Sequence, residues 1–148
     1  MLYTIIQHAH SGWRWVVLIL LVWAIVSAFG KWRSGATFTE TDRKRAFFAM
    51  TATHLQLLFG LVLYFISPYV KFADDTMKDP LLRFYTVEHI FIMALAIFVI
   101  SGGYRRSLGR ATDTAKFKTQ FYYFLIGLLL ILAGIPWPFR EGLSGAWF

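Results

Sequence analysis

The stretch WRWVVLILLVWAIVSAFG at residues 13–30 carries a single charged side chain, Arg14, and it decides the fold class. A helix needs about 20 mainly apolar residues to cross the roughly 30 Å hydrocarbon core of a bilayer. Three further stretches of this kind follow at residues 46–66, 84–103 and 121–137. Because lipid-exposed backbone must satisfy its own hydrogen bonds, all four are expected to be helices. We therefore predict an all-α, polytopic membrane protein with four transmembrane helices.

The composition of the 148-residue chain agrees with lipid as its main solvent. Hydrophobic residues make up 57% of it and aromatic residues 19%, whereas 16% are charged. A soluble domain of this size needs polar side chains over most of its surface, because little of it is interior. Since no repeat or linker divides the sequence, we predict one antiparallel four-helix bundle that covers residues 1–148 as a single domain. The pair Gly102-Gly103 is expected to end its third helix.

Lysine and arginine are distributed unevenly between the connections. They cluster after the first and third apolar stretches, at Lys31, Arg33, Arg43, Lys44 and Arg45 and at Arg105, Arg106, Arg110, Lys116 and Lys118. By the positive-inside rule these two connections lie in the cytoplasm, so both termini are expected on the outer side (N-out, C-out). The start of the chain has no basic segment before the first apolar run, which we expect to be kept as a helix.

The net charge of +7 follows from this topology and from contact with anionic headgroups, so membrane lipid is the first expected partner. A nucleic-acid-binding protein needs a basic folded surface, and this charge pattern does not predict one. The chain has no cysteine, which excludes disulfides, thiolate metal sites and covalently attached haem.

Several polar side chains stand where a bilayer disfavours them. They are His8, His10, Arg14, His54, Gln56, Arg83, Glu88 and His89. Ionisable groups inside a membrane are costly, so each suggests a function by default. With a rise of about 1.5 Å per residue, all four histidines fall between the midplane and the outer face. On the first helix, His10 and Arg14 share a stripe with Val17, Leu21, Ala24 and Ala28, which is expected to face the bundle interior.

Histidines on different helices of a dry bundle favour haem b as a cofactor, because imidazole is a strong axial ligand of haem iron. His54 and His89 are the first candidate pair, since both are embedded and lie on consecutive helices. His10 with His89 agrees better in depth, so the pairing stays open, and His8 is a weaker candidate. Two axial ligands leave no open position, which suits electron transfer.

The other polar residues have candidate roles around such a cofactor. Arg14 and Arg83 would neutralise the haem propionates near the outer face. Gln56, Glu88 and Arg14 would bind and protonate a quinol, which links the protein to the quinone pool. Glu88 is also a candidate structural partner of Arg14 or of a histidine, because buried charges need partners.

Four segments carry a resemblance to known proteins. They are HAHSGWRW (residues 8–15), HLQLLFGLVLYFISP (54–68), MKDPLLRFYTVEH (77–89) and IPWPFR (135–140). In combination they resemble a family of small bacterial four-helix membrane proteins identified as cytochrome b or cytochrome b-like, over nearly the whole chain. The resemblance implies a b-type haem protein of the bacterial inner membrane. Within these segments it points to the polar residues named above.

Two alternatives from other classes stand beside haem. Met50 lies four residues before His54 and Met93 four residues after His89, and two histidines with two methionines suit a soft ion such as Cu(I). The chain also fits a cofactor-free accessory subunit of a respiratory complex, or a homo-oligomer. It has no phosphate-binding glycine loop, nucleophile elbow or HExxH motif, so we expect an electron-transfer protein or subunit rather than a stand-alone enzyme.

Overall fold

The computed structural model describes residues 1–143, 145 and 147, and that part of the chain contains helices and no strand. In chain order the elements are α1 (Leu2–Ser34), α2 (Glu40–Ile66), α3 (Pro80–Arg83), the π-helical turn η1 (Phe84–Glu88), α4 (His89–Leu108) and α5 (Asp113–Gly134). The segments α3, η1 and α4 follow one another without a break and form one span. The predicted all-α fold with four long helices is confirmed.

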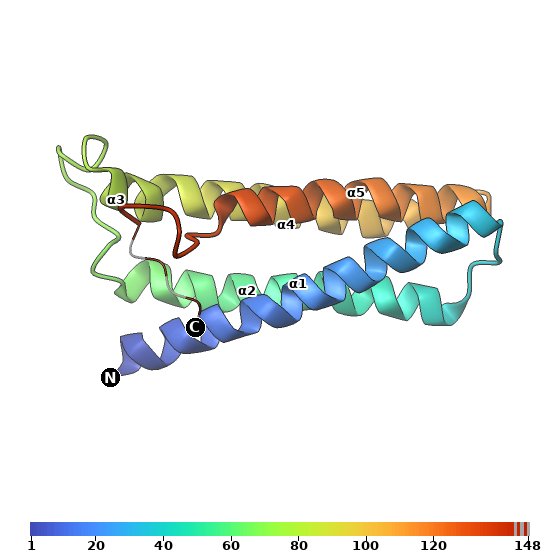
Figure 1. Cartoon of the computed structure of the whole chain (residues 1–148), viewed down its shortest axis with the longest axis horizontal. Coiled ribbons are helices and arrows are strands. Elements are labelled where there is room, and N and C mark those ends of the chain that lie inside the picture. Colours follow the sequence, from blue (N-terminus) through green and yellow to red (C-terminus); the bar gives the residue numbers. More distant parts are fainter. Residues whose placement is uncertain (144, 146, 148) are drawn as a thin grey trace.

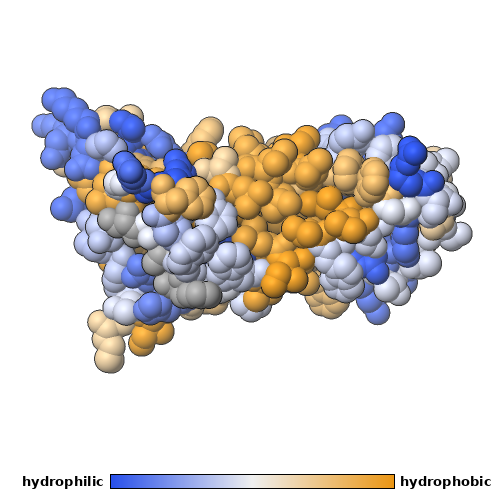
Figure 2. Space-filling model, in the orientation of Figure 1, coloured by the Kyte–Doolittle hydropathy of each residue, from blue (hydrophilic) through white to orange (hydrophobic). Residues whose placement is uncertain are grey.

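All four spans are long and apolar enough to cross a membrane. Figure 2 shows a wide apolar band around the middle of the molecule, with hydrophilic surface toward both ends. Large side chains are exposed to the surroundings along the spans, among them Trp23 at 53% and Phe98 at 76%. Soluble monomers rarely expose apolar surface on this scale, whereas lipid accommodates it. The chain is therefore a multi-pass membrane protein.

Two helical hairpins, α1–α2 and α4–α5, make up the bundle (Figure 1). Helix α1 packs against both α2 and α5, and α4 packs along α5, while α2 and α4 have the least extensive of these interfaces. The loops at 35–39 and 109–112 lie together at one end, called the basic end here. The N-terminus, the 67–79 connection and the C-terminal segment lie at the opposite end, called the terminal end.

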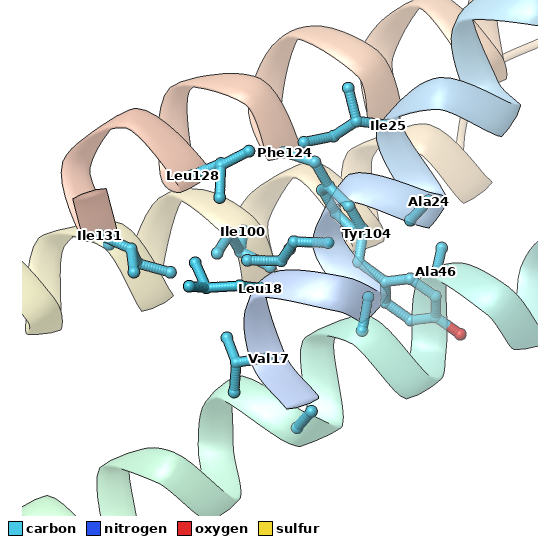
Figure 3. Close-up of a cluster of buried hydrophobic side chains, with 14 of the residues drawn as sticks. Val17, Leu18, Ala24, Ile25, Ala46, Ile100, Tyr104, Phe124, Leu128 and Ile131 are labelled. Atoms are coloured by element: carbon cyan, nitrogen blue, oxygen red, sulfur yellow. The ribbon is translucent and has the colours of Figure 1, made fainter. Parts of the chain in front are cut away.

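All four spans contribute apolar side chains to the core. Figure 3 shows core side chains from all four spans, among them Leu18 of α1, Ala46 of α2, Ile100 of α4 and Leu128 of α5. The interior stripe predicted on the first helix is confirmed from Arg14 onward, because Arg14, Val17, Leu21, Ala24 and Ala28 are all buried, whereas His10 is half-buried. This face of α1 carries a cationic side chain at the terminal end and small residues toward the basic end.

Two glycines bring α4 and α5 into close contact. A Cβ atom at Gly103 would clash with Tyr123, and one at Gly127 would clash with Ile100. Small residues permit such close approach of helices in membranes. The prediction that Gly102-Gly103 ends the third helix is wrong, since α4 continues to Leu108. The backbone hydrogen bonds run on into the polar residues that follow the apolar stretch.

A buried carboxylate joins α1 and α2 at the basic end. Asp42, 2% exposed, accepts hydrogen bonds from Lys31 Nζ at 2.6 and 2.8 Å and from Arg45 Nη1 at 2.8 Å. It also accepts from the backbone N–H and the hydroxyl of Thr39, completing a capping box at the start of α2. The two cations and the cap compensate for the loss of water around this charge.

Candidate functional site

The terminal half of the bundle encloses a cavity of about 190 Å³ between α1, α2 and the third span. Its polar lining consists of Tyr3, Gln7, His10, Ser11, Arg14, Thr53, Gln56, Tyr64, Ser67, Tyr69, Tyr85 and His89. On α1 the lining runs from Tyr3 to Val17, which corresponds to about 21 Å along the helix axis. Leu57, Leu61 and Ile97 contribute apolar wall. The cavity is thus a long slot with polar groups in an otherwise apolar surround.

Two histidines face each other across this slot. The ring centroids of His10 on α1 and His89 at the start of α4 lie 6.2 Å apart, with an angle of 71° between the ring planes. A metal held at about 2 Å from one nitrogen of each of two imidazoles separates the ring centroids by roughly 6 Å. The observed spacing therefore matches two imidazoles placed to share one metal centre.

The ring of His89 is oriented by the end of α5. Its Nδ1 lies 2.8 Å from the carbonyl oxygen of Gly134, the last residue of α5. The final carbonyl groups of a helix have no partner within the helix, which leaves this oxygen able to accept. Because a carbonyl only accepts, Nδ1 must be the protonated nitrogen, and Nε2 keeps its lone pair. Histidines that bind metals are commonly held by such a hydrogen bond from the second ring nitrogen.

The π-helical turn η1 ends directly at this histidine. The backbone N–H of His89 bonds to the carbonyl of Phe84, five residues earlier, instead of four. The extra residue lets Phe84 and Thr86 remain buried while His89 lines the cavity. The carbonyl of Thr86 accepts a hydrogen bond from the Tyr64 hydroxyl at 2.8 Å. Such bulges are frequent at functional sites, and nothing in the apolar periodicity predicted this one.

The ring of His10 rests on a glycine of α2. A Cβ at Gly60 would come 3.2 Å from His10 Cε1 and 3.7 Å from Nδ1, so this edge of the ring lies against the helix. One turn earlier on α2, Gln56 Nε2 donates to the backbone carbonyl of His10 at 2.9 Å. Within the described part of the chain, His10 Nδ1 and Gln56 Oε1 are buried and have no hydrogen-bond partner. Buried polar atoms in proteins are nearly always hydrogen-bonded, so these two atoms need a partner.

Arg14 places a positive charge on the cavity wall. The residue is 8% exposed, and its Nη2 donates to the carbonyl of Trp147 at 2.7 Å. Its guanidinium also lies 5.6 Å from the ring centroid of Trp15 and 5.7 Å from that of Trp137. Arg14 therefore connects the cavity with the C-terminal segment.

Arg83 and Glu88 lie outside the cavity lining. They form an ion pair with each other, with 2.6 Å between Nε and Oε1, and both side chains are more than a third exposed. The expectation that Glu88 pairs with Arg14 or a histidine is wrong, because the neighbouring turn of its own helix supplies the partner. Neither residue therefore belongs to the cavity lining that contains His10 and His89.

His54 and His8 are likewise apart from the cavity. His54 Nδ1 lies 3.0 Å from the carbonyl of Met50, and its Nε2 lies 3.2 Å from Ser101 Oγ on α4. Ser101 follows His89 by twelve residues, or about 18 Å along the helix. His8 is exposed. The structure thus separates His54 from His89 and brings His10 to it instead.

Sequence reasoning missed part of the cavity lining. Tyr3, Gln7 and Ser11 line the slot on α1, in the part of the helix that precedes the apolar stretch. Their four-residue spacing continues the polar face of His10 and Arg14 and was the signal that could have revealed them. Tyr69 of the 67–79 connection carried no such signal.

Comparison with known proteins adds no further constraint. The chain matches no protein-family model, no curated protein and no solved structure.

Proposed function

We propose that this chain is a membrane-embedded b-type haem protein that transfers electrons, with His10 and His89 as the axial ligands. The observation that carries the proposal is the pair of imidazoles 6.2 Å apart across a cavity between helices. The Gly134 carbonyl supports it, because it holds His89 in the tautomer that leaves Nε2 available to a metal.

The set of donors in the cavity suits haem. Across the residues that the structure describes, no three side chains of His, Asp or Glu come together as a metal site. Haem brings four nitrogen ligands of its own and needs only axial partners from the protein. The slot of about 21 Å, with apolar walls, offers length for a flat macrocycle. Arg14 on its wall is placed to neutralise a propionate.

When bound, haem supplies reversible one-electron chemistry. His10 and His89 would occupy both axial positions, which favours electron transfer over activation of a small ligand. By the positive-inside rule, the basic end faces the cytoplasm of a bacterial cell and the cavity lies in the outer half of the inner membrane. We propose the quinone pool as the electron partner, because several tyrosines give the slot polar groups within reach of lipid-soluble molecules.

An absorption spectrum of the detergent-purified protein, oxidised and then reduced with dithionite, tests the proposal. We expect sharp α and β bands and a shifted Soret band after reduction. His10→Ala and His89→Ala should each abolish this six-coordinate spectrum, whereas His54→Ala and His8→Ala should retain it. A protein that stays colourless when produced with ample haem would refute the haem assignment. Loss of the spectrum in His54→Ala but not in His10→Ala would refute the ligand pair.

A soft metal ion is the second candidate, because Met93 lines the same cavity one turn after His89. Two imidazoles and a thioether are donors that Cu(I) accepts. Metal analysis of the colourless protein would then find copper, and Met93→Leu would weaken its binding. In a haem protein the same substitution should leave the axial ligands in place and keep the reduced spectrum.

A further inference from the structure

We infer that Gln56 is the positioning residue for His10, acting as the hydrogen-bond acceptor that fixes the proton on Nδ1 and turns Nε2 toward the ligand. The inference rests on the proposed function, in which His10 Nε2 binds the iron. It assigns to Gln56 a role on the protein side of His10, distinct from contact with haem or quinone.

The placement of Gln56 supports this role. Its Nε2 already donates to the His10 carbonyl at 2.9 Å, so the amide group is anchored beside this residue. The Nδ1–Cε1 edge of the ring lies against Gly60, one turn further along the same helix. His10 Nδ1 is therefore on the side of the ring that faces α2, the helix that carries Gln56.

The unpaired atoms are complementary. Within the described residues, His10 Nδ1 and Gln56 Oε1 are both buried and have no hydrogen-bond partner. A buried polar atom without a hydrogen bond is energetically costly, which favours a direct hydrogen bond between the two. Gln56 Oε1 can only accept, so the pair requires the proton on His10 Nδ1.

In this arrangement His10 and His89 would each donate a hydrogen bond from Nδ1 to a carbonyl oxygen. His89 Nδ1 donates to the carbonyl of Gly134, and in the inferred arrangement His10 Nδ1 would donate to the side-chain carbonyl of Gln56. A hydrogen bond to the second nitrogen sets the tautomer of a metal-binding histidine and raises its basicity. Removing such a partner commonly lowers metal affinity by about 10–100-fold.

The first measurement uses the full-length protein without haem, so that it does not depend on haem binding. Two-bond ¹⁵N–¹H correlation spectra of ¹⁵N-histidine protein report which ring nitrogen carries the proton, and His10→Ala assigns the signal. The pH is kept well above the ordinary histidine pKa of about 6.5. We expect the Nδ1–H form for His10 in the unmodified protein and in Gln56→Glu, which retains an acceptor. Gln56→Leu, similar in size, should give a mixture of tautomers.

The second measurement is titration with ferric haem b and determination of the midpoint potential. Gln56→Leu should bind haem about 10–100-fold more weakly and at a higher potential, and Gln56→Glu should restore affinity with a lower potential. Ser101→Ala is the matched control, since it removes a hydrogen bond between α2 and α4 outside the cavity. It should change neither the His10 tautomer nor the potential.

The outcomes separate the two proposals. If the unmodified protein binds haem but Gln56→Leu behaves like Ser101→Ala, the inference about Gln56 is overturned while the haem assignment stands. If no haem binds but the His10 tautomer responds to Gln56→Leu, the proposed function fails and the hydrogen bond to His10 stands. An Nε2–H tautomer of His10 in the unmodified protein overturns the inference, whatever the variants do.

Discussion

Asp42 is the residue whose charge is most completely enclosed, with Lys31 and Arg45 as its partners. We expect Asp42→Asn to lower the free energy of unfolding by about 3 kcal/mol, because it leaves two cations without their shared carboxylate. Lys31 is still 34% exposed, which keeps the loss at the low end of the range for buried pairs. Unfolding by SDS in mixed micelles measures this quantity.

Asp113→Asn serves as the comparison for Asp42. Asp113 pairs with Lys116 at 3.0 Å, but its side chain is 37% exposed. Exposed ion pairs contribute little because solvent screens them, so the loss should be much smaller than for Asp42→Asn. If both variants lose the same free energy of unfolding, burial of Asp42 does not determine how much its ion pairs stabilise the protein.

At the same scale, the sequence identified four of the polar residues that line the cavity but not which histidines lie together. The cost of polar groups in lipid correctly drew attention to His10, Arg14, Gln56 and His89, which line one cavity. The same criterion selected His54, which is equally embedded. Its partner Ser101 lies on another helix, and the periodicity of one helix carries no information about what the neighbouring helix presents.

The contact between α4 and α5 depends on Gly103, which packs against α5, whereas the adjacent Gly102 faces open space. A Cβ at Gly103 would clash with Tyr123, whereas one at Gly102 would meet nothing within 4 Å. Gly103→Ala should therefore force the helices apart and cost about 1–3 kcal/mol. Gly102→Ala should be neutral or stabilise by up to about 1 kcal/mol, because alanine is the better helix former. Both values come from SDS unfolding, and similar losses in both variants would argue against the close contact.

The number and type of the helices were predictable, and their ends were less so. Apolar composition reports the part of a helix that lipid surrounds, whereas backbone hydrogen bonding continues into polar residues. Helix α1 thus begins at Leu2, well before the apolar stretch that starts at residue 13. The turn η1 was not predictable, because it depends on the simultaneous packing of Phe84, Thr86 and His89 against other elements.

The molecule as a whole has its two basic loops at one end and both termini at the other (Figure 1). If the basic end is cytoplasmic, a cysteine in the 67–79 connection should react with a membrane-impermeant maleimide added to intact cells. The chain has no cysteine of its own, so Asp74→Cys and Thr37→Cys, both at exposed positions, give single labels at opposite ends. We expect Asp74→Cys to react at once and Thr37→Cys only after permeabilisation. The reverse pattern would invert the topology.

His10 belongs to the hairpin α1–α2 and His89 to the span that opens the hairpin α4–α5, and between these hairpins α2 contacts α4 less extensively than α1 contacts α5. A ligand that binds to both histidines would therefore hold the two hairpins together non-covalently. By mass action, a ligand at a thousand times its Kd adds about 4 kcal/mol to the assembled state. During synthesis the first hairpin is complete before His89 has been made. If a cofactor binds both histidines as proposed, its capture would require that both hairpins have been inserted and have docked, and binding would be a late step in assembly of the bundle.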